Sequence, residues 1–404
     1  MSRGLLLTFG VFQNYYETVL LRAQSSGSIA WISTTCAFIV LSAGVVTGPL
    51  YDRGYYKVLL VVGTSLEVFG LMMLSLSTKY YQLFLAQAIC VGLGAGIVFT
   101  PSVAAAAACF TNPATRAKIM GLMAAMSSVG MCLKTTSFSQ TAKTRAGGII
   151  YPIMFRYLLP EIGFPRTVRS IAFIVMALYF ISWAALLNEL PKPPKVRRIL
   201  DTSAFTDWPY MAICFASIFS SAAYYIPMLY IPTLTIVRIP SFSPERGFDL
   251  LAVINGASAV GRILIGLIAA AFGPTETITV SAALASVVLF CWIPVDTSAG
   301  IWVWAVFWGM LSGAIVALPG AFIPLFCPDI SLIGTRNGMY WVWTAVGMLI
   351  GSPIAAAIYE PKSAEKGWWK LQVFSAVFMM MAAILSVYPS IHLRRRNRME
   401  KLAT

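Results

Sequence analysis

The chain has 404 residues, of which 58% are hydrophobic and only 11% are charged, and its mean hydropathy is +0.78. Soluble domains carry roughly 25% charged residues, so a soluble fold of this length could not keep so much apolar area away from water. The formal charge of +14 would normally suggest nucleic acid as a partner, but the basic residues lie in short gaps between apolar runs, where they act as topology signals. We therefore expect an all-α protein embedded in a lipid bilayer, with no nucleic-acid partner.

Cysteine and histidine usage excludes several kinds of catalytic and metal chemistry. The seven cysteines show no metal or redox spacing, and most lie inside apolar runs, where small packing residues are expected. His392 is the only histidine and lies in a basic tail, which excludes a histidine metal site, a catalytic triad and a histidine proton relay. The apolar runs contain no nucleophile–base pair and no paired carboxylates. We expect no cofactor, no metal and no enzymatic activity.

Apolar runs of about 20 residues, the length that crosses the hydrocarbon core, recur along the whole chain. The first run, residues 4–16, is too short, as though half of the opening helix were missing. Residues 117–130 and 148–159 are each half a span. The runs that are long enough lie near 28–50, 58–77, 82–103, 170–190, 209–234, 248–272, 277–295, 301–325, 335–358 and 369–391. These ten runs, the short first run and the two half-spans joined into one helix together predict twelve transmembrane helices.

One break divides these helices into six and six. Residues 191–208 form a proline-rich basic linker that continues neither neighbouring helix. We assign the linker to the cytoplasm because it and the basic tail, residues 392–404, carry most of the Lys/Arg excess. The predicted organisation is an N-terminal half over residues 1–190, the linker, a C-terminal half over 209–391 and the tail.

Residues 131–147 interrupt the predicted fifth helix with three cations and a run of hydroxyl side chains, which a helix in hydrocarbon would not tolerate. Their deletion joins two apolar stretches without a gap. The codons of residues 130–132 can contain GTATGT, a typical fungal intron start, and those of residues 146–147 can contain the intron end CAG. We therefore predict that this stretch is a retained intron. The alternative is a genuine re-entrant or cytoplasmic excursion.

The turn after the second span carries the motif GPLYDRGYYK, residues 48–57. Gly48 permits close helix contact, and Asp52 can interact with a helix N-terminus or a cation. Arg53 and Lys57 can anchor the turn at the cytoplasmic lipid surface. This motif resembles the loop signature of the major facilitator superfamily.

Further stretches resemble the monocarboxylate-porter branch of that superfamily, and its fungal members in particular. They run along nearly the whole chain and include FGVFQNYYE at 9–17, GLGAGIVFTPS at 92–102, DTSAFTDWPY at 201–210 and NGASAVGRILIG at 255–266. The resemblance implies a twelve-helix major facilitator fold that works by alternating access, with a small-molecule substrate held near the midplane between the halves. A monomer is sufficient for such a mechanism.

Arg262 is the leading candidate for substrate binding because it lies inside span 248–272, too far from either end to reach the interface. A buried guanidinium is costly unless it is paired, and its fork of donors suits a carboxylate. The resemblance also places a substrate-binding arginine at this position. We add Asn255 and Ser258, on the same helix, to the candidate set. The alternative interpretation is a structural contact within the membrane.

Three further residues extend the candidate site. Glu67 is a candidate for proton coupling because a buried carboxyl group can take up and release protons. The alternative is that a protonated Glu67 simply hydrogen-bonds a neighbour. Trp308 and Trp341 lie deep enough in their spans to stack on a planar substrate, whereas ordinary packing is the alternative.

The leading functional hypothesis is a carrier of small, monocarboxylate-like organic anions, with or without proton symport. Two departures weaken it: animal members of the branch have an acidic residue where Ser258 stands, and a lysine near Leu7. The alternative is an exporter of a fungal secondary metabolite or an importer of a larger planar compound such as a vitamin. A hypothesis from a different functional class is a non-transporting membrane sensor or an inactive paralogue. We expect the plasma membrane, with the vacuolar membrane as the alternative.

Overall fold

Helices and turns build the whole of the described structure. The computed structural model describes residues 12–13, 15–108, 150–185, 199–239, 242, 244–327, 329, 332–358 and 368–403. Within these ranges, ten helical segments are long and apolar enough to cross a membrane: Gly27–Asp52, Tyr56–Leu74, Tyr80–Phe99, Tyr157–Ile181, Trp208–Arg238, Asp249–Phe272, Pro274–Cys291, Ser298–Phe326, Ile333–Ile358 and Trp368–Arg396. Nine of them closely match runs predicted from hydropathy, whereas Tyr157–Ile181 begins 13 residues before the predicted run 170–190 and ends nine residues before it does. The short first run, Leu7, and residues 109–149 with the predicted insert lie mostly outside the described residues.

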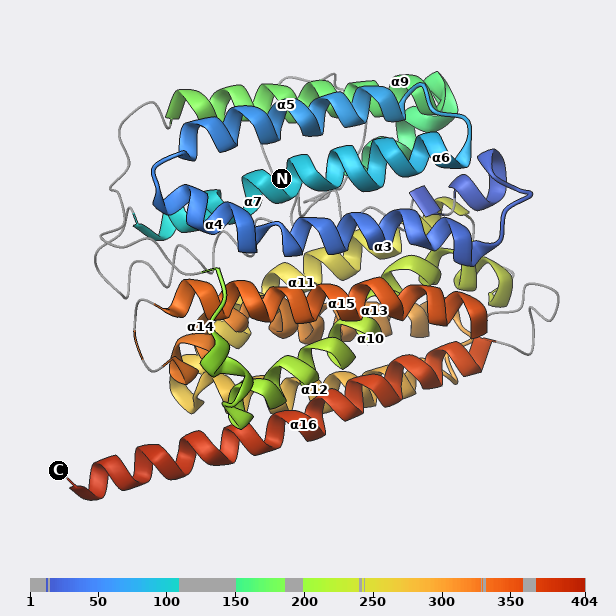
Figure 1. Ribbon diagram of the computed structural model, residues 1–404. Helices are drawn as coiled ribbons and strands as arrows, with labels where there is room; N and C mark the ends of the chain where they lie inside the picture. Colours follow the sequence, from blue (N-terminus) through green and yellow to red (C-terminus); the bar gives the residue numbers. More distant parts are fainter. Residues whose placement is uncertain are drawn as a thin grey trace.

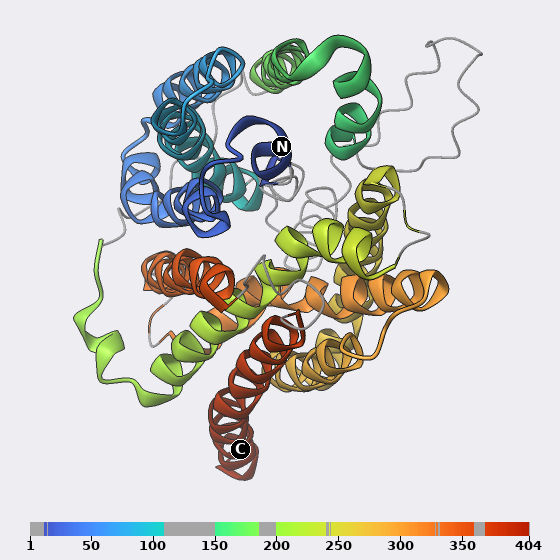
Figure 2. The same ribbon diagram turned by 90° about the vertical axis from the view of Figure 1, so that its right-hand side faces the viewer.

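The N-terminal half lies on one side of the molecule (Figures 1 and 2). It consists of η1 (Tyr16–Leu20), α3 (Ser26–Ser42), α4 (Gly44–Asp52), α5 (Tyr56–Leu74), α6 (Tyr80–Leu83), η2 (Phe84–Val91), α7 (Gly92–Ala108) and α9 (Ile150–Ala185). Two spans are composite, since α4 continues α3 and α7 continues α6 and η2. Gly163, with a φ of +75°, breaks α9 into two helices. Glycine suits this position because it adopts the left-handed conformation without a steric penalty.

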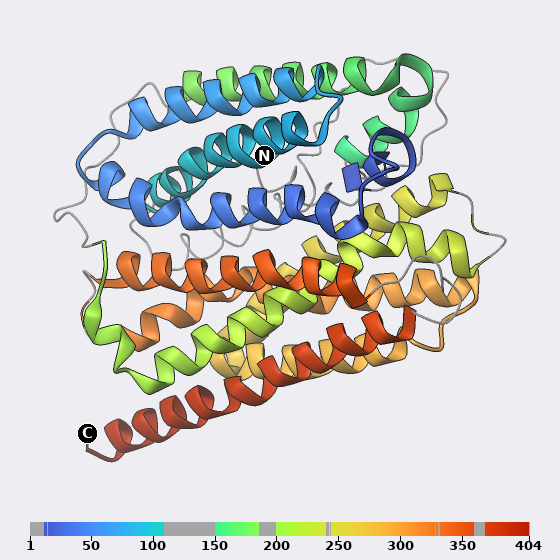
Figure 3. The same cartoon turned by 45° about the vertical axis from the view of Figure 1, so that its right-hand side comes forward.

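The C-terminal half lies on the other side. After the short η3 (Thr202–Phe205) it contains α10 (Trp208–Arg238), α11 (Pro244–Phe272), α12 (Pro274–Cys291), α13 (Ser298–Ala317), α14 (Pro319–Phe322), η4 (Ile323–Phe326), α15 (Ile333–Ile358) and α16 (Trp368–Ala403). The segments α13, α14 and η4 form one span. The predicted basic tail continues α16 as a helix that projects beyond the bundle (Figures 1 and 3).

The described residues join the halves through the pairs α3–α15 and α9–α11, and α4, which continues α3, also packs against α15. The first pair lies side by side in Figures 1 and 3. At the start of α15, a methyl group added at Gly338 would make an ordinary van der Waals contact with Val45 of α4, 3.7 Å from its Cγ2 atom. The surface between the halves is therefore formed by helices from both, as a central binding site between two repeats requires.

Glycines bring helices into backbone contact inside each half. A methyl group added at Gly351 of α15 would lie 2.6 Å from Cα of Ala222 in α10. One added at Gly94 of α7 would lie 2.7 Å from the carbonyl oxygen of Gly63 in α5. Lipid tails are as apolar as the helix surfaces, so close van der Waals packing of small residues stabilises helix association in membranes. Close packing therefore accounts for glycines within the spans of both halves.

Candidate substrate-binding site

Three of the predicted residues lie on one face of α11. Asn255, Ser258 and Arg262 are spaced by three and four residues, the spacing that stacks side chains along one side of a helix. Their exposed fractions are 2%, 1% and 2%. All three fall inside the membrane-spanning segment Asp249–Phe272. The charge of Arg262 is therefore enclosed by protein at membrane depth and does not face lipid.

Several buried polar atoms on α11 and α13 could form hydrogen bonds with a ligand or with water. Within the described part of the chain, Oδ1 of Asn255 and Oγ of Ser258 have no hydrogen-bond partner. The same holds for Nε1 of Trp308 in α13. Buried polar groups in proteins are nearly always hydrogen-bonded, so each exception needs an explanation. A polar molecule that enters between the helices would satisfy these atoms.

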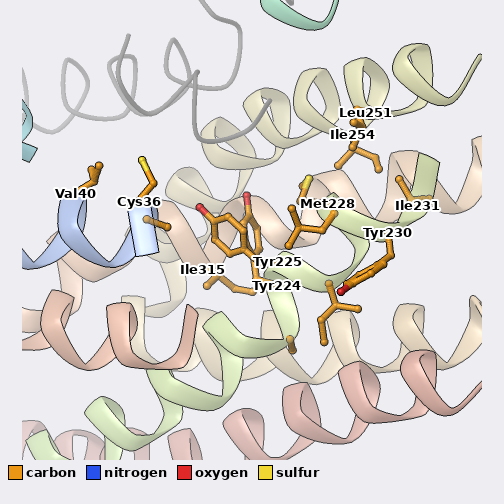
Figure 4. Packing of buried hydrophobic residues seen from close by; sticks show 14 of the residues in the cluster. Cys36, Val40, Tyr224, Tyr225, Met228, Tyr230, Ile231, Leu251, Ile254 and Ile315 are labelled. Atoms are coloured by element: carbon orange, nitrogen blue, oxygen red, sulfur yellow. The ribbon is translucent and has the colours of Figure 1, made fainter. Parts of the chain in front are cut away.

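Two tyrosines of α10 accompany Arg262. Tyr224 and Tyr225 lie in α10, which packs against α11, and the Tyr224 ring lies 6.3 Å from the ring of Trp308 in α13, the helix that touches the backbone of Arg262. Both tyrosines are buried, with exposed fractions of 2% and 7%. Figure 4 shows their rings side by side, with the hydroxyl ends turned in the same direction. A guanidinium donates only, and a phenol hydroxyl can also donate, so the group of three suits an oxyanion.

The two tyrosines continue a row of aromatic rings. The Tyr224 ring lies 5.2 Å from the Tyr225 ring at an interplanar angle of 67°, and 6.3 Å from the Trp308 ring. Trp308 is parallel to Trp304 at 6.0 Å, and Trp304 to Trp292 at 4.8 Å. Offset and edge-to-face contacts of this kind each contribute about 0.5–1.5 kcal/mol. Trp308 is fully buried in this row, which holds the Tyr224 ring in place.

The contact between α11 and α13 fixes the backbone beneath the site. A methyl group added at Gly313 of α13 would lie 2.8 Å from the carbonyl oxygen of Ser258 and 3.0 Å from the amide nitrogen of Arg262. Gly261 is likewise pressed against the backbone of Met310. The two helices touch without intervening side chains, so the position of Arg262 is set by backbone contact.

Two of the predicted residues lie elsewhere. Trp341 belongs to α15, is half-buried and meets Tyr340 edge to face at 5.6 Å. Its helix packs against α10, the helix of Tyr224 and Tyr225. Glu67 belongs to the N-terminal half, where it is 1% exposed in α5. Tyr179 of α9 donates a hydrogen bond of 2.5 Å to its Oε2 atom. The candidate for proton coupling is therefore in the opposite half from the candidate for substrate binding.

The loop motif after the second span forms a tight turn. Gly48 and Asp52 are buried at the end of α4, whereas Arg53 and Lys57 are exposed. Gly54 has a φ of +93° and reverses the chain between α4 and α5. The exposure of Arg53 and Lys57 leaves their predicted contact with the lipid surface possible in geometry, and that contact stays a prediction.

A second buried arginine, which we did not single out from the sequence, lies at the start of α15. Arg336 is 2% exposed. Its Nε donates to Oδ2 of Asp201 at 2.9 Å, and its Nη1 to Oδ2 of Asp207 at 2.6 Å and to the carbonyl oxygen of Phe326 at 2.5 Å. Tyr210 places its ring 5.1 Å from the guanidinium carbon. We call Asp201, Asp207 and Arg336 the linker clasp.

The linker clasp attaches part of the predicted linker to the C-terminal half. Asp201 caps η3 by accepting from the amide and the hydroxyl of Ser203, and Tyr210 donates to the carbonyl oxygen of Arg336 at 2.7 Å. Burial raises the pKa of Asp201, but hydrogen bonds from Ser203 and Arg336 outweigh burial, so the pKa lies below its ordinary value. The partners of Arg336 are separated from it by 129 and 135 positions, which no local pattern reveals.

Comparison with known proteins decides the family. The MFS-type transporter dbaD of Emericella nidulans is 35% identical to this chain over 382 residues, which cover 95% of this chain and 81% of that protein. The chain belongs to the major facilitator superfamily. Residues 5–133 also match the family described as Major Facilitator Superfamily.

Two further members of the superfamily are similar over nearly the full chain. The MFS-type transporter 1 of Ophiocordyceps sp. is 33% identical over 403 residues, 99% of this chain and 84% of that protein. The aspyridones efflux protein apdF of Emericella nidulans is 33% identical over 384 residues, 95% of this chain and 73% of that protein. This major facilitator is thus a multi-pass membrane transporter with a small-molecule substrate, and not an enzyme. The names of these relatives do not confirm the closer resemblance to monocarboxylate porters.

Proposed function

We propose that this transporter exports an acidic fungal secondary metabolite by alternating access. The observation that carries the proposal is Arg262, a guanidinium enclosed in the middle of α11, which packs against the helix of Tyr224 and Tyr225. An enclosed site of hydrogen-bond donors at membrane depth suits an anionic group on the cargo. The aspyridones efflux protein, 33% identical to this chain, favours export over the uptake of small monocarboxylates.

The length of the polar face on α11 also favours a larger cargo. At 1.5 Å per residue, Ser258 lies about 6 Å and Asn255 about 10 Å from Arg262 along the helix axis. A three-carbon acid bound to Arg262 could not reach Asn255, whereas a ring system with further polar groups could. The unpartnered oxygens of Asn255 and Ser258 would then accept from hydroxyl or amide groups of the cargo.

The contacts between the halves suggest how the cargo would cross. The pairs α3–α15 and α9–α11 lie between the halves, and α11 carries the candidate site. Rocking of one half against the other about these pairs would open the site first to one side and then to the other. Net transport requires that the cargo bind the two states with different affinity.

We further propose that Glu67 couples export to proton entry. Its carboxyl group is buried and accepts a 2.5 Å hydrogen bond from Tyr179, which also lies in the N-terminal half. Proton uptake there would change the charge inside that half, and so bias the way it packs against the other. The substrate site and the proton site would then be linked through the surface between the halves.

Flux in proteoliposomes tests the export proposal. The intact chain, and a version without residues 131–147, would be reconstituted with 2-naphthoate as an acidic ring-containing probe and pyruvate as a small acid. Arg262→Gln is the test variant, and the unsubstituted protein is its reference. We expect 2-naphthoate flux in the reference and a flux about tenfold or more lower in Arg262→Gln, since hydrogen bonds to charged groups contribute about 1.5–3 kcal/mol.

The other outcomes decide between the remaining functions. Pyruvate flux with no 2-naphthoate flux would restore the monocarboxylate carrier. No flux of either probe from either version would favour a sensor or an inactive paralogue. Glu67→Gln should keep exchange of 2-naphthoate but lose its acceleration by a pH gradient; a variant that still responds to the gradient would exclude Glu67 as the coupling site.

A further inference from the structure

We infer that Tyr224 and Tyr225 determine substrate specificity, and that they select compounds whose ionised oxygen is carried on or next to a planar ring, such as phenolic, enolic or aryl carboxylic acids. This inference rests on the proposed function and names the class of its cargo. Neither tyrosine stands out in the sequence, because both lie in an apolar run that reads as ordinary packing.

The relative position of the two rings is the first observation. Consecutive residues of an α-helix point about 100° apart, so neighbouring side chains usually serve different surfaces. Here the two rings are 5.2 Å apart, and Figure 4 shows their hydroxyl ends turned to the same side. α10 packs against α11, and Trp308, 6.3 Å from the Tyr224 ring, belongs to α13, whose Gly313 adjoins the backbone of Arg262. Two hydroxyl groups of α10 and one guanidinium of α11 therefore serve one location.

The chemistry of these groups points to an oxyanion. The guanidinium supplies a fixed positive charge, and each phenol can donate one hydrogen bond. Charge-assisted hydrogen bonds are roughly twice as strong as neutral ones. A neutral ligand of the same shape would gain less at this location, so ionised compounds are preferred over neutral analogues.

The aromatic row provides the selection for a ring. Trp292, Trp304 and Trp308 are stacked in sequence and hold Tyr224, while Tyr225 is the last ring of the row. A face at the end of a fixed row can stack on a planar ligand without the cost of ordering a flexible side chain. Across from this end, α3 contributes the buried Cys36 and Val40 from the other half (Figure 4). The rings thus lie at the level where the two halves meet.

Binding to the purified full chain in detergent tests the inference separately from transport. The probes are 2-naphthoate, the neutral 2-naphthamide and pyruvate, each titrated calorimetrically. We expect Tyr225→Phe to weaken 2-naphthoate binding about tenfold, because one hydrogen bond to a charged group is lost, and to leave 2-naphthamide nearly unchanged. Tyr225→Leu should in addition remove the preference for 2-naphthoate over pyruvate, because the ring is lost.

The matched control is Tyr230→Phe on the same helix. The Tyr230 hydroxyl donates to the carbonyl oxygen of Ser352 in α15 at 3.5 Å, so we expect its removal to leave all three affinities unchanged. Thermal unfolding without ligand shows whether each variant is folded, and Tyr224→Phe serves as a second variant if Tyr225→Phe is not.

Two results would overturn the inference. One is wild-type protein that fails to prefer 2-naphthoate over 2-naphthamide and pyruvate. The other is a set of tyrosine variants that bind like the wild type while Arg262→Gln loses affinity, which would leave the tyrosines as packing residues only. The second result would leave the export proposal standing, because that proposal depends on Arg262. After the first result, the export proposal would stand only if 2-naphthoate flux is still observed and still depends on Arg262.

Discussion

At the scale of single residues, the two buried arginines of the C-terminal half differ in the groups around them. Arg336 is held by two carboxylates and a carbonyl oxygen. Arg262 lies in the middle of a membrane-spanning helix that packs against α10 and α13. Arg336 therefore fits a structural role, and Arg262 remains the candidate for contact with the cargo.

Arg336→Gln should destabilise the C-terminal half. Removal of one partner from a buried pair leaves the other charge uncompensated and typically costs about 3–5 kcal/mol. Thermal unfolding of the purified protein in detergent measures the loss. The control is Arg394→Gln, since Arg394 pairs with Glu276 at 3.0 Å but its side chain is 71% exposed, and exposed pairs contribute little. Equal unfolding temperatures for the two variants would contradict a structural role for the linker clasp.

The linker clasp should also make stability sensitive to acid. Because the pKa of Asp201 is lower in the folded protein than its ordinary value of 3.8, folding is favoured while the carboxyl group is ionised. The stabilisation is complete above the ordinary value and is lost as the pH falls through the lowered one. Unfolding temperatures measured from neutral pH to below pH 4 should fall more steeply for the wild type than for Asp201→Asn. Parallel curves would exclude Asp201 as the titrating group.

The sequence predicted some residues of the site and missed others for a physical reason. Arg262 could be found because a cation inside an apolar run is costly and therefore conspicuous. Asn255 and Ser258 lie on the same face and followed from its position. Tyr224 and Tyr225 could not be found, because an aromatic residue in an apolar run is the ordinary case. The role of each candidate in transport stays a prediction.

At the scale of helices, the packing of α11 on α13 should be sensitive to a single methyl group. Gly313→Ala would place that group 2.8 Å from the carbonyl oxygen of Ser258, and overpacking of this kind costs typically about 1–3 kcal/mol. The helices would move apart and Arg262 with them. We expect a lower unfolding temperature and weaker 2-naphthoate binding.

Gly266→Ala is the matched control on α11. A methyl group there meets no atom within 4 Å, so the variant should bind like the wild type. Its helix should gain up to about 1 kcal/mol from the better helix propensity of alanine. Loss of binding in both glycine variants would show that the effect arises from helix propensity and not from contact with α13.

Helix positions were predictable from hydropathy, but their interruptions were not. A run of about 20 apolar residues suffices to locate a span. The separate segments α3 and α4, or α13, α14 and η4, look continuous in composition because breaks in a membrane helix are satisfied by neighbouring helices.

At the scale of the whole molecule, the largest open prediction concerns residues 131–147. The family match extends over residues 5–133 and so ends just inside this stretch. We expect the version without these residues to reach a higher 2-naphthoate flux than the intact chain, because the fifth helix then becomes continuous. Transcript sequencing supplies the direct check. A single transcript that retains the stretch, together with equal flux from both versions, would show that it is a genuine part of the transporter.

The division into two halves was predictable, but the pairing between them was not. Apolar faces do not specify which helices touch, so the contacts α3–α15 and α9–α11 depend on shape and on small residues such as Gly338. The assignment to the superfamily came from residues distributed along the entire chain, and the relatives then favoured export over the monocarboxylate carrier.

The position of the linker clasp has a practical meaning for dissecting the protein. Two co-expressed fragments divided just before Asp201 should reassemble, because the second fragment keeps both carboxylates that Arg336 requires. Fragments divided just after Asp207 should not reassemble, because both carboxylates would then lie at the C-terminus of the first fragment, and Arg336 in the second fragment would lose its partners within that fragment. Co-purification of tagged fragments would show that the linker belongs to the C-terminal half from Asp201 onward, several residues before α10 begins at Trp208.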